Sequence, residues 1–436
     1  MAQLPLEGIR VSDITVVYAG PFVCRLLADL GAEVIRVESC QNWQTITRGV
    51  FARPPKEFIM TQWPYTGGYP NRDPMGPTKR PWNRWPLFHA HAGNKRSFTV
   101  NLRRPEGMDI FKRLIRVSDV FVENNPPETM QKLGISYEML KEQKPDIIMV
   151  RVPAYGLTGP YQNYRGYGSH IECVAGHAML RGYADLEPTT LAHVPATDAA
   201  VGAHGAFAVL SALHYRHRTG KGQLIEVPQV QNAFPFLDQA ILDYTMNGRV
   251  QKTIGNRHPS AAPCGVYRCR GQDRWVMITV YSDDDWRGFC RALGNPPWSQ
   301  EERFSDALSR WKNQDELDKL IEEWTLRHDH VAVMHLLQKE GVACGPVEDQ
   351  RDAYNDTQLK DRGFFEQLTH VDCGTHLYPG MLYKLSKTPL SIRLPPCRLG
   401  EHNEYVYKKV IGVSDQEYAA LEKAGHIGMD FDPSIP

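Results

Sequence analysis

The segment from Thr190 to Val227 constrains the fold of this chain more than any other. A polar turn ends at Asp198 and leads into an almost wholly apolar run, Ala199–Leu213, that mixes small and large residues. Apolar residues on every side predict a helix buried among other elements rather than laid on a surface. Asp198 stands where an N-cap is expected, immediately before the apolar run, and a short strand is expected at 224–227.

Asp198 has two interpretations on this local pattern. Asp is a common N-cap, so a purely structural role accounts for its position. Backbone N–H groups and the positive end of the helix dipole also keep such a carboxylate ionised at neutral pH. An ionised, positioned carboxylate can attack an acyl group as a nucleophile. Both interpretations stay open at this point.

Length and composition place the chain among ordinary globular proteins. The chain has 436 residues, which is more than one typical domain, so two domains are expected. Its 50 basic and 50 acidic residues balance, which gives no support for nucleic-acid binding. The N-terminus lacks a signal-peptide pattern and no apolar run reaches membrane-spanning length, so we expect a cytoplasmic protein without a membrane partner. Nine cysteines without regular spacing indicate reduced thiols.

The N-terminal region has the pattern of a βαβ unit. A strand is expected at Ile9–Asp13, a helix at Phe22–Leu30 and a second strand at Val34–Glu38. This alternation predicts a parallel sheet. The turn Ala19–Pro21 is not Gly-x-Gly-x-x-Gly, so the sequence does not indicate a dinucleotide site.

The sequence indicates no metal site. His89 and His91 alternate as in a strand, and no third ligand follows nearby. Cys264 and Cys269 lack the two-residue spacing of a zinc knuckle. We therefore expect neither pair to bind a metal ion.

The stretch 42–92 is the least regular part of the chain. It is rich in Pro and aromatic residues and is too long to be a simple connector. We weigh two interpretations, a lid or wall for a bulky substrate and a packed surface loop or dimer contact. The aromatic residues concerned are Trp63, Tyr65, Tyr69, Trp82, Trp85 and Phe88.

Several motifs, spread over nearly the whole chain, together resemble those of the class III CoA-transferases, the CaiB/BaiF family of formyl-CoA and carnitine CoA transferases. The aromatic-rich stretch is outside this resemblance, and members of the benzylsuccinate CoA-transferase type are possible near relatives. The motifs are Asp198-x-x-x-Gly202, the turn Arg216–Gln223, Asn94–Ser97 followed by Arg104–Gly107, Val122–Asn124, Gly255–Ser260, Gly341–Val347 and Gly400–Asn403.

The resemblance implies an α/β fold with two domains. A Rossmann-like parallel-sheet large domain would come from both termini, residues 1–228 and 341–436. A smaller α+β domain would come from residues 229–340. In this family two chains interlock like links, so an interlocked dimer is expected, either a homodimer or a heteromer with a related subunit.

The resemblance also implies a reaction and the residues that perform it. Asp198 would be the catalytic nucleophile, acting on a coenzyme A thioester that is a substrate, with no permanently bound cofactor. The acceptor would be a carboxylic acid. The residues expected to bind coenzyme A are Val17, Tyr18, Arg103, Asn124, Lys132 and Leu133. Asn256, His258 and Ser260 would belong to the loop that closes over the nucleophile and stabilises the oxyanions through backbone N–H groups.

Departures from the family pattern leave alternatives open. Tyr167-Gly168 replaces the His-Asp pair of the racemase branch, which disfavours an acyl-CoA racemase or isomerase. Many transferases carry Asp at the Gly168 position, and Glu172 is a weaker candidate to replace that carboxylate. Ser39 stands where relatives carry Arg. A mainly structural subunit of a heteromeric transferase is the other alternative. His170 is expected to be structural, and the aromatic insertion suggests an aromatic or aryl-substituted dicarboxylic acid as substrate.

Overall fold

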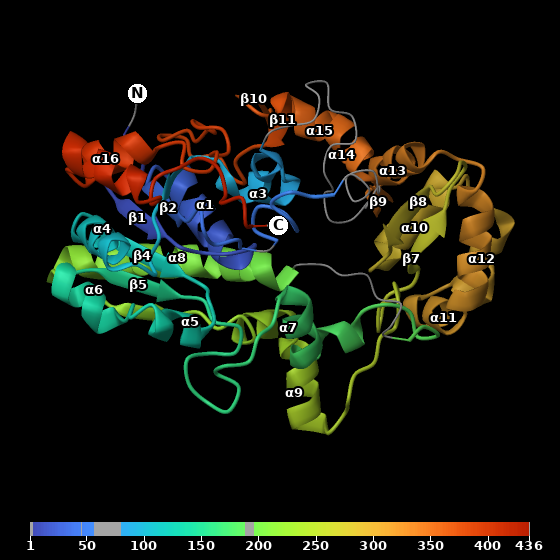
Figure 1. The fold of residues 1–436 in the computed structure, drawn as a ribbon. Coiled ribbons are helices and arrows are strands. Elements are labelled where there is room, and N and C mark those ends of the chain that lie inside the picture. The colour runs from blue at the N-terminus through green and yellow to red at the C-terminus, as the bar shows by residue number, and fades with distance from the viewer. Residues whose placement is uncertain (1–2, 45, 56–79, 188–195, 436) are drawn as a thin grey trace. The chain divides into compact units, whose positions relative to one another are not determined.

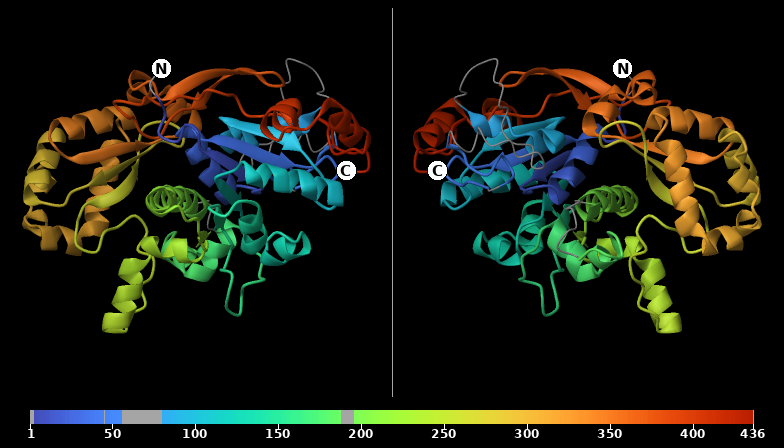
Figure 2. Two further views of the ribbon diagram at one scale, coloured as in Figure 1. Left: turned by 90° about the vertical axis from the view of Figure 1, so that its left-hand side faces the viewer. Right: turned by 90° about the vertical axis from the view of Figure 1, so that its right-hand side faces the viewer.

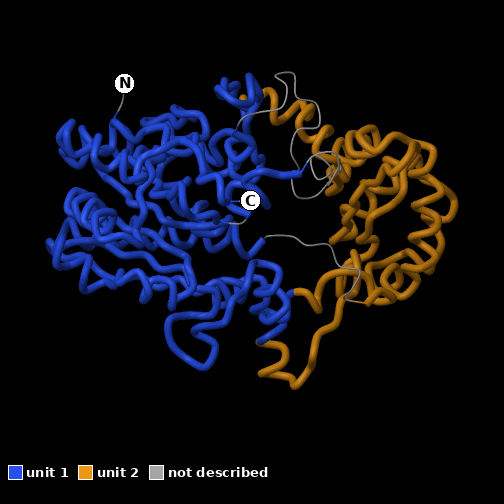
Figure 3. Tube along the Cα trace, viewed as in Figure 1, with its two compact units in different colours: residues 1–177, 193–241, 364–436 blue, residues 178–192, 242–363 orange. Residues whose placement is uncertain are grey.

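The structure is a computed structural model that describes residues 3–44, 46–55, 80–187 and 196–435. The chain divides into two compact units, which Figure 3 colours separately. Unit 1 comprises residues 1–177, 193–241 and 364–436, and unit 2 comprises residues 178–192 and 242–363. The larger unit contains both ends of the chain, and the smaller one is built from its middle.

Unit 1 is organised around a six-stranded parallel sheet with the order β3-β2-β1-β4-β5-β6. Val11 of the central strand pairs with Val34 on one side and with Val120 on the other. The strand order reverses between β1 and β4, and in such sheets ligands bind beyond the carboxyl ends of the strands at this point. The strands are β1 (Arg10–Asp13), β2 (Glu33–Glu38), β3 (Lys95–Thr99), β4 (Val120–Glu123), β5 (Ile148–Arg151) and β6 (Leu224–Glu226).

Helices cover both faces of this sheet (Figures 1 and 2). One hydrophobic core lies between the sheet and the pair α1 (Ala19–Asp29) and α8 (Ala196–Thr219). The other core lies on the opposite face, where the covering helices are amphipathic. These are α4 (Pro105–Arg116), α5 (Pro127–Lys132), α6 (Tyr137–Gln143) and α16 (Asp415–Lys423).

The remaining elements of unit 1 lie outside this layered core. They are α3 (Pro86–Ala92), α7 (Gly168–Ala175), the first residues of α9 (Asp238–Asn247) and an antiparallel hairpin of β10 (Phe365–His370) and β11 (Gly374–Pro379). The strand expected around His89 and His91 is therefore a helix. Pro86 stands at its first position, where proline's fixed φ favours helix initiation.

Helix α8 corrects three expectations. Asp198 lies inside its first turn rather than at an N-cap. The helix is also buried on one face only, since Phe207 is 71% exposed while Val201, Gly205 and Val209 are buried. Contrary to the expectation that no apolar run reaches membrane-spanning length, α8 is long and apolar enough by length and composition alone, and 44% of its most apolar window is buried.

Glycines explain why α1 and α8 pack so closely. A Cβ atom built on Gly202 would lie 2.2 Å from Cδ1 of Phe22, and one on Gly205 would lie 2.6 Å from Cγ2 of Val23. Such contacts are too short for real atoms, so both positions require glycine. The Asp198-x-x-x-Gly202 spacing therefore brings the start of α8 against α1.

Unit 2 contains a three-stranded antiparallel sheet, β7-β8-β9, packed against helices. Strand β9 pairs with β8 and so belongs to this unit. The unit then continues to residue 363. The sequence-based boundaries were 228/229 and 340/341, whereas the contacts divide the chain at 241/242 and 363/364. The elements are β7 (Cys264–Arg268), β8 (Trp275–Thr279), β9 (Ala343–Val347), α10 (Asp283–Ala292), α11 (Ala307–Lys312), α12 (Gln314–Thr325), α13 (His330–Lys339), α14 (Gln350–Asn355) and α15 (Thr357–Asp361).

All nine cysteines are free, as predicted.

Candidate active site

A cavity of about 1110 Å³ lies in unit 1 where the strand order reverses. Its wall includes Val16–Ala19, which follow β1, and Asn124–Pro127, which follow β4. The start of α7 and Asp198 of α8 complete this part of the wall. The cavity therefore occupies the place where parallel α/β sheets bind ligands.

The turn after β1 has an unusual backbone at the cavity. Val17 has a φ of 60°, although it is β-branched and disfavours the left-handed region. Its N–H donates to Oγ1 of Thr47 at 2.8 Å, which helps to hold this conformation. Strained residues of this kind cluster at functional sites, and Val17 lines the cavity.

Asn124 holds this turn through its side-chain amide. Its Oδ1 accepts from the N–H of Val16 at 2.7 Å, and its Nδ2 donates to the Val16 carbonyl at 3.0 Å. A Cβ on Gly20 would lie 2.8 Å from Cγ of Asn124, so the turn packs directly on the amide. The sequence predicted that Asn124 binds coenzyme A. It does line the cavity, and in addition it positions Val17 and Tyr18.

Asp198 is 9% exposed and lines the cavity. Nε2 of Gln229 donates to its Oδ1 at 3.4 Å. Burial and, to a smaller extent, the negative charge of Glu172 raise the pKa of Asp198, the Gln229 hydrogen bond opposes them, and the resulting pKa is about 6. A carboxyl group of this pKa is still mostly ionised at neutral pH, as expected, although the helix end does not lower its pKa. Burial in a low-dielectric site outweighs the helix dipole.

Tyr18 lies close to Asp198. Burial raises the pKa of the Tyr18 hydroxyl, and the charge of Asp198 raises it as well. The ring stacks on Phe22 with centroids 5.8 Å apart and meets His91 edge-on at 6.1 Å. A protonated phenol is therefore fixed beside the carboxylate and can donate a hydrogen bond.

Because residue 168 is a glycine, the Asp198 carboxylate can lie directly against the backbone there. A Cβ atom at Gly168 would lie only 2.0 Å from Oδ2 of Asp198. The start of α7 thus approaches the carboxylate so closely that a side chain at position 168 would force Asp198 to move. One helical turn later, Glu172 is 2% exposed and accepts from the N–H and Oγ1 of Thr197, each at 3.4 Å. Glu172 therefore lies just behind Asp198.

Aromatic and aliphatic side chains form much of the remaining wall. Trp43, Val50, Trp85 and Leu87 come from the irregular stretch 42–92, and Tyr164 and Tyr167 come from the segment before α7. The part of that stretch that is described thus supports the interpretation as a wall. Trp82 and Phe88 are buried in small clusters of their own, and Trp63, Tyr65 and Tyr69 lie outside the described residues.

His170 also reaches the cavity wall. Its Nδ1 accepts a hydrogen bond from the N–H of Tyr167 at 3.3 Å, at the start of α7. This hydrogen bond holds the side chain of His170 against the backbone at the start of α7.

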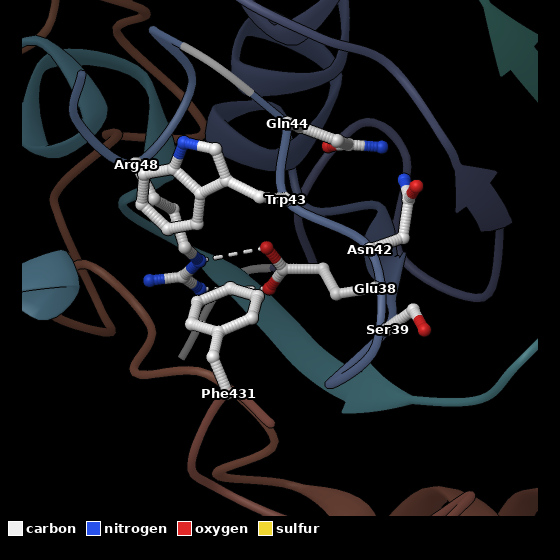
Figure 4. A pocket seen from close by; sticks show the side chains of 7 residues that line it. All are labelled: Glu38, Ser39, Asn42, Trp43, Gln44, Arg48 and Phe431. Carbon is white, nitrogen blue, oxygen red and sulfur yellow. Dashed lines mark hydrogen bonds and ion pairs between the residues drawn. The ribbon is translucent and has the colours of Figure 1, made fainter. Parts of the chain in front are cut away.

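A second, much smaller hollow of about 10 Å³ adjoins the end of β2 (Figure 4). Arg48 binds Glu38 through two hydrogen bonds of 2.7 Å. Burial alone would raise the pKa of Glu38, but Arg48 and Arg36 lower it to about 2. Ser39 lines this hollow.

Three of the predicted coenzyme A residues do not line the large cavity. Nη2 of Arg103 donates to Oδ1 of Asn42, which lines the small hollow, at 3.2 Å. The Lys132 side chain is 74% exposed and lies 3.4 Å from Glu128. Leu133 packs against the core under α4 and α6. The structure therefore brings Val17, Tyr18, Asn124 and Asp198 together and leaves these three outside the group.

The predicted loop residues belong to unit 2. Asn256 donates from Nδ2 to the Tyr183 hydroxyl at 2.7 Å, and Nδ1 of His258 accepts from the N–H of Ser260 at 3.2 Å. Asn256 and His258 are half-buried and Ser260 is exposed, and none of the three lines the cavity of unit 1.

The sequence reasoning missed Gln229, which contacts Asp198 directly. Gln229 follows β6, and its N–H donates to the Pro153 carbonyl at 2.9 Å, which fixes the backbone beside β5. The sequence did offer one signal for Gln229, because this residue follows shortly after the strand predicted at 224–227 and therefore lies at the carboxyl edge of the sheet.

Comparison with known proteins agrees with this geometry. The sequence profile of CoA-transferase family III matches residues 6–403. The succinyl-CoA–D-citramalate CoA-transferase of Chloroflexus aurantiacus is 30% identical, with 96% of this chain and 97% of that protein covered. The β subunit of succinyl-CoA–L-malate CoA-transferase from the same organism is 30% identical (95% and 96% covered), and human succinyl-CoA:glutarate CoA-transferase is 28% identical (97% and 89% covered).

Solved structures show the same fold. A CAIB/BAIF family protein from Brucella suis superposes with a TM-score of 0.78 at 29% identity, covering 94% of this chain and 100% of that one. The protein Rv3272 from Mycobacterium tuberculosis has a TM-score of 0.72 at 24% identity (92% and 99% covered), which supports the fold alone. The profile spans most of the chain, and the cavity lies where such a fold binds its ligand. The chain belongs to CoA-transferase family III, and it is a CoA-transferase.

Proposed function

We propose that this chain moves coenzyme A from an acyl-CoA donor to a carboxylic acid through a covalent intermediate on Asp198. The observation that carries the proposal is the position of Asp198 in the cavity, together with Val17, Tyr18 and Asn124. Among the described residues that line the cavity, Asp198 is the only acidic one. Its carboxylate is the nucleophile available to an acyl group there.

In the first half of the reaction an oxygen of Asp198 attacks the thioester carbonyl of the donor. The carbon–sulfur bond breaks, which gives a mixed anhydride and the coenzyme A thiolate. The thiolate then attacks the aspartyl carbonyl of the anhydride. This step forms an aspartyl-CoA thioester and releases the donor acid as a carboxylate.

The second half repeats these steps in reverse with the acceptor. The acceptor carboxylate attacks the aspartyl thioester and again forms an anhydride and a thiolate. The thiolate attacks the acceptor's acyl carbon, which forms the new acyl-CoA and regenerates the Asp198 carboxylate. No proton is consumed in either half, so the reaction requires Asp198 to be ionised when it attacks the donor, and the last step regenerates that carboxylate.

The protonation states fit these steps. With a pKa of about 6, Asp198 is ionised in about ten molecules for each one that is protonated at neutral pH. A carboxylate of this pKa is also more basic than an ordinary aspartate. Tyr18 stays protonated, because its pKa is raised, and can donate a hydrogen bond to the oxyanion that develops on the carbonyl.

Trapping of the covalent intermediate tests the proposal. The wild-type protein mixed with donor acyl-CoA should gain the mass of an aspartyl-CoA adduct at Asp198, and hydroxylamine should convert that residue to the hydroxamate. Asp198→Asn should lose both the adduct and several orders of magnitude in rate. Asp238→Asn, at an exposed aspartate in the first turn of α9, is the matched control and should retain both. Wild-type transfer in Asp198→Asn would refute the nucleophile.

The same protein discriminates the alternative reactions. An acyl-CoA racemase or isomerase would exchange the α-proton of its substrate with deuterated solvent, and a transferase would not. A mainly structural subunit would form no adduct when purified alone.

We propose that a second chain covers the exposed face of α8. Phe207 on this helix is 71% exposed, and Val174 on α7 is 57% exposed. Exposed apolar patches of this kind mark interaction surfaces. The occupant is a second copy of this chain, in an interlocked dimer, or a related subunit, since similar proteins are named as α and β subunits. The oligomeric state of the purified chain, measured by light scattering, distinguishes a homodimer from a monomer that needs another subunit.

We propose that the acceptor is a carboxylic acid with an apolar body, such as an aromatic or aryl-substituted dicarboxylic acid. Trp43, Trp85 and Tyr167 support this, because they give the cavity aromatic walls. Succinyl-CoA is the first donor to test, since several similar proteins are named for it. A screen of acyl-CoA donors against aliphatic and aromatic acids, read by mass spectrometry, would identify the donor and the acceptor. Preference for short aliphatic acids would contradict the proposal.

A further inference from the structure

A second cluster of chemically reactive side chains lies in unit 1 and takes no part in the proposed transfer. His89 comes from α3, His370 ends β10, and Cys373 lies in the turn before β11. The nitrogen and sulfur atoms that these residues offer all lie within 4.8 Å of one another. Figure 1 shows α3 beside the β10–β11 hairpin, which brings the three residues together.

We propose that His89, His370 and Cys373 bind one divalent transition-metal ion, Zn²⁺. The spacing agrees with this ion. A Zn–S bond of about 2.3 Å and a Zn–N bond of about 2.0 Å at a tetrahedral angle place sulfur and nitrogen roughly 3.5 Å apart. Sγ of Cys373 lies 3.8 Å from Nε2 of His89, so this pair needs a shift of only a few tenths of an ångström to reach that separation.

His370 supplies an independent indication of a ligand. It is 2% exposed, and its Nε2 atom is buried without a hydrogen-bond partner among the residues that the structure describes. Buried polar atoms of native proteins are nearly always paired, so such an atom requires an explanation. A metal ion bound to Nε2 gives it the missing partner.

His89 already has the outer contacts of a metal-bound imidazole. Its Nε2 donates to the Asn83 carbonyl at 2.7 Å, and its Nδ1 lies 2.9 Å from the Tyr378 hydroxyl. When Nε2 binds the metal ion, its hydrogen bond to the Asn83 carbonyl breaks, and the ring proton moves to Nδ1 and is donated to the Tyr378 oxygen. Ligating histidines usually donate their second N–H in this way, which fixes the orientation of the ring.

The proton balance of binding is simple. The Cys373 thiol loses one proton to solvent and binds as the thiolate. Both imidazoles bind in the neutral form, and His370 gives up the hydrogen bond that its Nδ1 accepts from the Asp372 N–H at 3.1 Å. Two hydrogen bonds are lost, one from His89 to the Asn83 carbonyl and one within the turn after β10, and three metal–ligand bonds are gained.

The ligand set selects the ion and suggests a role. A thiolate with two imidazoles favours Zn²⁺ over Mg²⁺ or Ca²⁺, which prefer oxygen ligands. The ion would join the C-terminal hairpin to α3. Leu87 of α3 and the preceding Trp85 line the cavity, so the metal site would hold part of the cavity wall in place. The sequence did not reveal this site, because two of its ligands lie far from His89 along the chain.

Cobalt titration of the full-length chain tests the site. Co²⁺, a spectroscopic probe for Zn²⁺, should bind one equivalent and give the near-ultraviolet absorption of a thiolate–cobalt bond, and Zn²⁺ should abolish that absorption. Cys373→Ser should lose the absorption, while Cys344→Ser, at another half-buried cysteine, should retain it. Absence of the absorption in the wild type, or its persistence in Cys373→Ser, would overturn the proposal.

A second pair of variants keeps the test decisive if Cys373→Ser folds poorly. His370→Asn should weaken Co²⁺ binding at least about a hundredfold, since loss of an outer contact alone typically costs about 10–100-fold. His335→Asn, at an exposed histidine of α13, should bind as the wild type does. Equal affinity in His370→Asn and the wild type would contradict a site at these residues.

Discussion

Replacement of the proposed nucleophile, Asp198→Asn, is expected to stabilise the protein at neutral pH while it abolishes transfer. The pKa of this carboxyl is about 6 in the folded chain, against 3.8 in its ordinary environment. The folded state therefore disfavours the charged form. Asparagine has the same shape, carries no charge, and can still accept the Gln229 hydrogen bond.

The size of the effect follows from the pKa difference. A difference of about 2 units corresponds to about 3 kcal/mol in the free energy of unfolding. At 9% exposure, Asp198 is little screened by solvent, so this order of magnitude applies. For a domain of this size, about 3 kcal/mol raises the melting temperature by about 5 °C.

The sign of the pH dependence is determined by the raised pKa. Above pH 6, Asp198 is ionised in both the folded and the unfolded state, and the full destabilisation is present. As pH falls through about 6 toward 3.8, the folded state takes up its proton first, so the wild type gains stability relative to Asp198→Asn. The difference in melting temperature between the two proteins should therefore shrink and vanish below about pH 4.

Thermal unfolding followed by circular dichroism over a pH series measures this difference. Asp238→Asn, at an exposed aspartate, should match the wild type at every pH. A melting temperature of Asp198→Asn equal to or below that of the wild type at neutral pH would refute the reasoning. So would a difference that persists unchanged in acid.

Three further outcomes are expected from the same site. Gly168→Ala should lower transfer at least about tenfold and cost about 1–3 kcal/mol, because its Cβ would lie 2.0 Å from Oδ2 of Asp198. Gly345→Ala, whose Cβ would meet nothing within 4 Å, should leave rate and melting temperature unchanged. Asn124→Ala loses two hydrogen bonds to the backbone before α1, so it should lower both the melting temperature and the rate. The pH–rate profile should have an acid limb near pH 6, and Glu172→Gln should move it to lower pH, because a neighbouring negative charge is removed. An unmoved limb would show that this charge does not act on the nucleophile.

Local sequence patterns predicted the central part of the fold. The strand, helix and strand expected between Ile9 and Glu38 are β1, α1 and β2, and their strands are parallel. Such patterns report the periodicity of a single element. They do not report which face of a helix another element covers, so the one-sided burial of α8 was missed. The alternation of His89 and His91 was likewise misleading, because the preceding Pro86 starts a helix.

The residues of the site were predicted in part. Val17, Tyr18, Asn124 and Asp198 meet in one cavity, and each follows a strand or begins a helix, where motifs are visible in the sequence. The ionisation of Asp198 was not predictable in the same way. It depends on burial and on the distance to Glu172, which are properties of the packed chain.

The loss of a side chain at position 168 bears on whether this chain is an active subunit. By sequence alone, Gly168 suggested a missing contact near the substrate and hence a mainly structural role. The structure shows that the backbone there lies so close to Asp198 that a Cβ would collide with its carboxylate. A second carboxylate, Glu172, is buried one helical turn later and raises the pKa of Asp198. A chain that had lost its function would have no reason to keep a buried carboxylate beside another, since the pair is unfavourable for folding. The arrangement therefore favours a rearranged active site over a lost one.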